Sequence, residues 1–148
     1  MYLSRLHRPR ALTLIEFVVS IGIMAVTFSL GAAFIRYHQP SITLSASARE
    51  LKGALQRARD YSLTRQNIFG IKFLVIENKY QIVTGVDVWE DITLPAMVQF
   101  YSVGPFANNT VRFNSSGAAS EAGTIVLQSS DGQQKQIIIS PSGYVRIE

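Results

Sequence analysis

The chain has 148 residues, enough for one small hydrophobic core, and carries 14 lysines and arginines against 10 acidic residues. It has no cysteine, which excludes disulfides, thiol catalysis and the common zinc motifs. The formal charge of +4 would suggest a nucleic-acid partner, but the excess of basic residues lies mainly at the start of the chain. Arg5, Arg8 and Arg10 precede the first apolar segment, and without them 11 basic residues face 10 acidic ones.

A basic leader, residues 1–11, is followed by an apolar run over residues 12–35. As a helix this run spans roughly 36 Å, enough to cross a bilayer core of about 30 Å. Three arginines precede it and only Arg36 follows, so the positive-inside rule predicts a cytoplasmic leader and an exported C-terminal region. Two alternatives remain open. One is a secretory signal peptide cleaved after Ala33, and the other is a simple signal anchor.

The single charge of the apolar run is Glu16, and a carboxylate inside a membrane span is a functional hypothesis by default. The leader, the small residue Ala11 and Thr13-Leu14-Ile15-Glu16 together resemble the class III leader of type IV pilins and type II secretion pseudopilins. The resemblance implies cleavage by a prepilin peptidase between Ala11 and Leu12, with methylation of the new N-terminus on Leu12. It also implies that Glu16 pairs with the terminal amine of a neighbouring subunit during filament assembly, with Thr13 in the same polar spot.

An amphipathic helix is predicted over residues 36–66, after a break or kink at Pro40. Its apolar stripe has helical spacing and consists of Leu44, Ala48, Leu51, Leu55, Ala58 and Ser62. Off the stripe lie the cations Arg49, Lys52, Arg57, Arg59 and Arg65, with only Glu50 and Asp60 as counter-charges. This basic face is either an ordinary solvated helix face or a surface for neighbouring subunits or an anionic polymer.

Residues 67–148 are predicted to form an antiparallel β-rich head, because short runs of strand-forming residues alternate with turn residues. The predicted strands cover residues 68–76, 80–84, 97–103, 110–113, 124–127, 136–140 and 144–147. Glu77-Asn78-Lys79 and Asp131-Gly132 are expected hairpin turns, and residues 87–91 an acidic, aromatic loop. A helix followed by antiparallel strands predicts an α+β fold.

The second half of the chain resembles the minor pilin branch that includes pseudopilin H and its type IV pilus relatives. The likeness lies in residues 51–67, in Val111-Arg-Phe-Asn-Ser-Ser-Gly117 and in the last strand pair, residues 137–147. It implies a minor pseudopilin of a type II secretion system, held in the inner membrane by one span, with its head in the periplasm. The implied partners are other pilin or pseudopilin subunits, the prepilin peptidase and methyltransferase, and the inner-membrane assembly platform.

The alternative is a type IV pilus minor pilin that primes pili or takes up DNA. Some pilus-type relatives implicated in DNA uptake carry two arginines after the last glycine. Here Tyr144 takes the first place and only Arg146 remains, which predicts weak DNA binding, through Arg146 with Arg49, Lys52, Arg57 and Arg59.

No enzyme, cofactor or metal site is predicted. The two histidines, His7 and His38, lie in the leader and at the end of the apolar run, away from the expected head. The spacing of Asp87, Glu90 and Asp91 matches no known oxygen-ligand loop for calcium.

Overall fold

The computed structural model describes the backbone of residues 13–148 and the side chains of residues 13–31 and 39–148. One helix, α1, runs from Leu14 to Arg65 with Pro40 inside it. Of the predicted break or kink at Pro40, the break is not found, because the residues on both sides are helical. A proline in a helix interior costs about 3 kcal/mol, an amount that the long helix around it can offset. The chain divides into two compact units, Met1–Tyr37 and His38–Glu148, and the second unit is the head.

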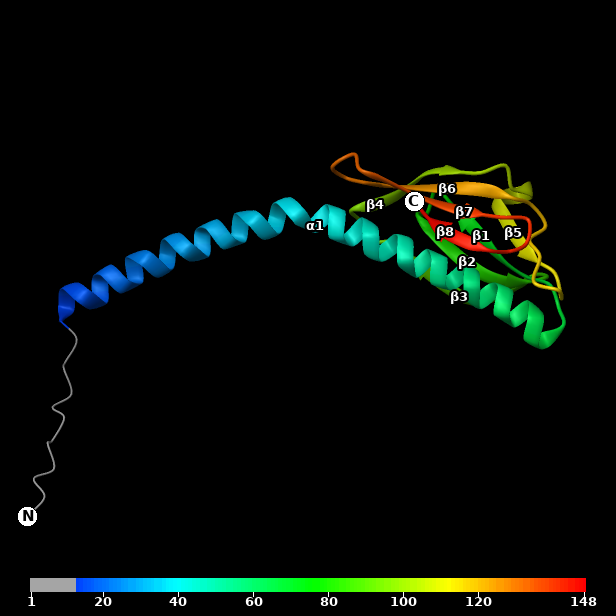
Figure 1. Cartoon of the computed structure of the whole chain (residues 1–148), viewed down its shortest axis with the longest axis horizontal. Helices are drawn as coiled ribbons and strands as arrows, with labels where there is room; N and C mark the ends of the chain where they lie inside the picture. Colours follow the sequence, from blue (N-terminus) through cyan, green and yellow to red (C-terminus); the bar gives the residue numbers. More distant parts are fainter. Residues whose placement is uncertain (1–12) are drawn as a thin grey trace, which may run out of the picture. The chain divides into compact units, whose positions relative to one another are not determined.

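The strands of the head form two antiparallel four-stranded sheets (Figure 1). The first sheet has the order β3-β2-β1-β5 and the second the order β4-β6-β7-β8. The strands are β1 (Phe69–Leu74), β2 (Lys79–Thr84), β3 (Asp87–Thr93), β4 (Val98–Val103), β5 (Thr110–Phe113), β6 (Gly123–Ser129), β7 (Gln134–Ile139) and β8 (Val145–Ile147). A short 3-10 helix, η1 (Ala107–Asn109), precedes β5. The predicted α+β fold is confirmed.

One hydrophobic core joins the head part of α1 to the inner faces of both sheets. All six residues of the predicted apolar stripe of α1 are buried, and Leu51, Leu55 and Ala58 are fully so. Alternate residues of β1 (Phe69, Ile71 and Phe73) enter the same core, as period-two strands require. The hydroxyl of Ser62, at the end of the stripe, donates to the Phe113 carbonyl and accepts from the Phe69 amide. The helix is thus joined to β1 and β5 by polar as well as apolar contacts.

The segment expected to be an acidic loop is instead the edge strand β3. Gly85 and Val86 form the turn between β2 and β3, and Tyr80 of β2 pairs with Ile92 of β3. Exposed charges at an edge strand prevent pairing with other chains, which explains an acidic sequence in a strand. The hairpins predicted at residues 77–79 and 131–132 are confirmed, since they join β1 to β2 and β6 to β7.

Candidate functional site

At the start of α1, Thr13 and Glu16 form a capping box. The Glu16 amide donates to the Thr13 hydroxyl at 3.3 Å, and the Thr13 amide lies 3.5 Å from a Glu16 carboxylate oxygen. This reciprocal arrangement satisfies helix N–H groups that have no partner within the helix. The second bond is long, so it leaves most of the carboxylate's accepting capacity unused. Ala11 and Leu12, the predicted cleavage and methylation residues, lie outside the described residues.

The apolar part of α1 contains one stretch, Leu14–Gly31, that is long and apolar enough to cross a membrane, and none of it is buried. Its hydroxyl side chains hydrogen-bond to carbonyls of the preceding turn. Ser20 donates to the Glu16 carbonyl, Thr27 to the Met24 carbonyl and Ser29 to the Ala25 carbonyl. Polar groups satisfied inside the helix are what an apolar solvent requires. No cation among the described residues lies within ion-pair distance of Glu16.

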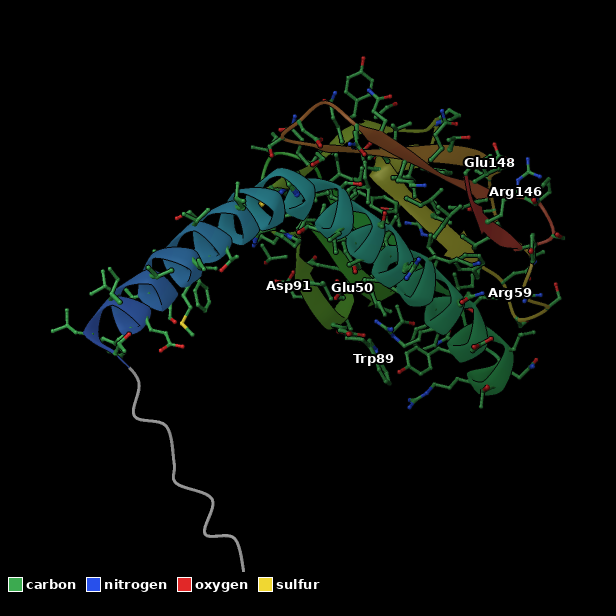
Figure 2. The ribbon with its side chains drawn as sticks, turned by 60° about the vertical axis from the view of Figure 1, so that its left-hand side comes forward. Glu50, Arg59, Trp89, Asp91, Arg146 and Glu148 are labelled. Carbon is green, nitrogen blue, oxygen red and sulfur yellow. The ribbon has the colours of Figure 1, made fainter. Side chains whose placement is uncertain are left out.

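Most cations of the predicted basic surface of the head already contact other residues of the chain. Arg57 forms an ion pair with Glu90 of β3 at 3.2 Å, and Arg146 pairs with Glu148 at 3.1 Å. Figure 2 shows Arg146 and Glu148 at one edge of the head and Glu50 on α1. Arg49 is exposed and Lys52 half-buried, and no described carboxylate lies within ion-pair distance of either. The structure does not gather the five predicted cations into one free patch.

Arg59 has a structural contact that the sequence did not reveal. Its Nε atom donates to the Gly117 carbonyl at 2.9 Å from a partly buried position. Gly117 and Gly143 have φ angles of 78° and 77°, which side chains rarely adopt. A Cβ atom would come within 3.1 Å of Arg59 Nε at Gly117, and at Gly143 it would overlap the Gly117 carbonyl oxygen. Arg59 therefore fills a notch between the turns at Gly117 and Gly143. At both of these positions only glycine fits.

A second unpredicted cluster covers the end of α1 with aromatic side chains. The rings of Tyr61, Phe69 and Trp89 lie with centroids 5.3–6.0 Å apart. The Arg65 guanidinium lies 4.3 Å from the centre of the Trp89 ring, a cation–π distance. Trp89 belongs to β3, so the mistaken loop assignment concealed this contact. The cluster joins β3 to the helix beside the Arg57–Glu90 ion pair.

Two head side chains have raised pKa values. Burial raises the pKa of Tyr80, whose fully buried hydroxyl has no hydrogen-bond partner. The hydrogen bond and charge of Glu77 raise the pKa of the half-buried Lys79, whose Nζ atom lies 2.6 Å from the Glu77 carboxylate. His7 lies outside the described residues, as does the side chain of His38. Among the residues described, no three acidic or histidine side chains form a metal-binding group.

The chain matches the family model of "Type II transport protein GspH" over residues 47–143. This match extends from the buried stripe of α1 to the turn before β8. No curated protein sequence matches the chain significantly.

Solved structures with the same fold come from two kinds of assembly. The minor pseudopilin EpsH of the Vibrio cholerae type 2 secretion system superposes with a TM-score of 0.61 and 16% identity, over 71% of this chain and 95% of EpsH. The type IV minor pilin FimU of Pseudomonas aeruginosa PAO1 superposes with a TM-score of 0.60 and 18% identity, over 78% of this chain and 92% of FimU. At these identities the likeness shows the fold alone.

Proposed function

The chain belongs to the type II transport protein GspH family of type IV pilin-like subunits, and we propose that it is a minor pseudopilin of a type II secretion system. The observation that carries this proposal is the family match over residues 47–143, which includes most of the head. Members of this family are structural subunits that assemble with other pilins in a filament. EpsH, a minor pseudopilin of a type 2 secretion system, has the same fold.

The single apolar helix fits a single-pass membrane anchor. We propose that the leader lies in the cytoplasm and the head in the periplasm, because three arginines precede the span. A prepilin peptidase then cuts between Ala11 and Leu12, methylation of Leu12 follows, and the inner-membrane platform receives the mature subunit. The filament extends into the periplasm and pushes secreted proteins outward.

Glu16 is the proposed assembly residue. An isolated carboxylate in a low-dielectric environment is unfavourable, and pairing with a cation relieves that cost. The long contact with its own Thr13 amide and the absence of a described cation nearby leave Glu16 able to accept from a neighbour's terminal amine. Thr13 orients the carboxylate through the capping box. The subunit thus supplies an acceptor through Glu16 and a donor through the amine of Leu12.

Two measurements test this proposal. N-terminal mass spectrometry of membrane-extracted protein should find a mature chain that begins at methylated Leu12. A chain that begins at Phe34 would instead identify a secretory signal and refute the pseudopilin assignment. Deletion of the gene should leave the secreted enzymes of the host in the periplasm while its pili remain normal, and the intact gene should restore secretion.

The second candidate is a type IV pilus minor pilin, since the minor pilin FimU has the same fold as well. In that case the deletion abolishes pili and leaves secretion intact, so one strain separates the two functions. A role in DNA uptake is the less favoured version. Tyr144 takes the place of one arginine, and the remaining Arg146 is paired with Glu148 at 3.1 Å.

A further inference from the structure

The outer face of the β3-β2-β1-β5 sheet, turned away from the hydrophobic core, has a defined arrangement of side chains. Strand register places Gln81, Lys72 and Thr110 in one row across β2, β1 and β5. The adjacent row consists of Val83, Gly70 and Arg112. Lys72 and Arg112 are therefore diagonal neighbours on adjacent strands, a position that separates side chains by about 7–8 Å.

A groove of about 410 Å³ runs over these rows, and its lining includes Lys72, Gln81, Val83, Val88, Thr110 and Arg112. Gly70 lies under the stem of Arg112, since a Cβ atom there would come within 3.2 Å of the Arg112 Cγ and would overlap the Val111 carbonyl oxygen. The glycine thus lets the arginine lie across β1. The groove combines two cations with the apolar side chains of Val83 and Val88.

The groove contains two cations that form no ion pair within the part of the chain that the structure describes. Lys72 and Arg112 are exposed, and no carboxylate of the described residues lies within ion-pair distance of either. Arg57, Lys79 and Arg146, by contrast, all have acidic partners. The acidic residue of this face is Asp91, which pairs in register with Gln81 and so lies two strands from Lys72, about 10 Å away. The groove thus offers two cations without described ion-pair partners, and Asp91 lies further along the same sheet face.

We propose that this groove binds an extended acidic segment of a partner protein, with carboxylates two residues apart. Alternate residues of an extended chain lie on one side at a spacing of about 6.7 Å, close to the diagonal distance between Lys72 and Arg112. An apolar residue of the same segment contacts Val83 and Val88. Duplex DNA is the poorer occupant, since specific affinity for it takes several phosphate contacts and the groove offers two cations beside Asp91. The proposal goes beyond the assignment to a secretion or pilus filament and holds for either.

The test uses the full chain in non-ionic detergent micelles and a fluorescein-labelled peptide with glutamate at two alternate positions and valine at the next alternate position, so that all three side chains lie on one side of the extended peptide. Binding is followed by fluorescence anisotropy. Lys72→Gln and Arg112→Gln should each weaken binding about tenfold, the effect of losing a hydrogen bond to a charged group. The matched controls are Lys135→Gln on β7 and Arg49→Gln on α1, since neither residue has an ion-pair partner among the described residues. Both controls should change binding by less than about twofold. A peptide with glutamine in place of glutamate should not bind.

Three results would overturn the proposal. The first is the absence of peptide binding up to about 1 mM. The second is equal weakening by the control variants, which would show non-specific attraction to the whole head. The third is displacement of the peptide by duplex DNA at lower concentration, with the same dependence on Lys72 and Arg112, which would identify a phosphate site. Because Lys72 lies on the open surface, Lys72→Gln should keep the thermal melting of the wild type and remains informative if Arg112→Gln is destabilised.

Discussion

Replacing Arg59 by alanine should destabilise the head, although the residue belongs to a basic helix face that resembles a binding surface. The substitution removes the 2.9 Å hydrogen bond from Nε to the Gly117 carbonyl. It also empties the notch between Gly117 and Gly143 and leaves a buried carbonyl unpaired. Hydrogen bonds to charged groups contribute about 1.5–3 kcal/mol, and partial exposure of Arg59 favours the lower half of that range, about 2 kcal/mol.

The magnitude can be converted into a melting temperature. A change of about 1 kcal/mol shifts the midpoint by roughly 4–8 °C for domains of 60–100 residues and by less for larger ones. For the head, His38–Glu148, we therefore expect Arg59→Ala to lower the midpoint by about 8 °C. The measurement is thermal unfolding of the full chain in detergent, followed by circular dichroism in the β region.

Arg49→Ala is the matched control, since Arg49 lies on the same helix, is exposed and has no ion-pair partner among the described residues. It should change the free energy of unfolding by less than about 0.5 kcal/mol. If Arg59→Ala melts with the wild type, the notch does not stabilise the head and the reasoning fails. The same conclusion follows if Arg49→Ala is equally destabilising, because the loss would then reflect general charge rather than the Gly117 contact.

Three further predictions concern assembly, burial and nucleic acid. Glu16→Leu should preserve membrane insertion and cleavage, since the span becomes more apolar. It should reduce incorporation into filaments, which subunit cross-linking measures. Unchanged cross-linking would show that the carboxylate has another role. Tyr80→Phe should stabilise the head by about 1 kcal/mol at neutral pH, because a buried hydroxyl without a partner is lost. Because the pKa of Tyr80 is raised in the folded head, the tyrosine ionises at lower pH in the unfolded chain than in the folded one. The stability of the wild type should therefore fall as pH rises above about 10. Chemical denaturation at increasing pH should show a smaller fall for Tyr80→Phe. Duplex DNA should bind weakly, and Arg146→Ala should leave that binding unchanged at low and high salt; tight binding lost in this variant would make DNA uptake the leading function.

The parts of the fold that the sequence predicts well depend on local periodicity. The stripe from Leu44 to Ser62 has helical spacing, and every one of its residues is buried. The strands around Ile71 and Ile137 combine apolar residues with clear turns, and both are in the sheets. These features can be predicted because one helix or strand buries one face, and that face is visible in the order of residues.

The strand β3 could not be predicted in the same way, because an edge strand is stabilised from one side only. Its residues Asp87, Glu90 and Asp91 are exposed, so neither alternation nor an apolar run marks it. What holds it is the pairing with β2 and the contacts of Trp89 and Glu90 with α1. Those contacts involve residues more than 20 positions away, beyond the reach of a local pattern.

The functional reading of basic residues depends even more on tertiary contacts. Counting cations along α1 predicts a positive face, but Arg57 and Arg59 face β3 and the turn at Gly117. Lys72 and Arg112 lie in different strands, 40 positions apart in the sequence, and only the register of β1 with β5 brings them into one groove. A cation contributes to a binding surface when its charge is not already neutralised, so the partners of each side chain decide the matter. On that criterion Lys72 and Arg112 of the outer sheet face qualify, and they lie together in one groove that suits an acidic partner.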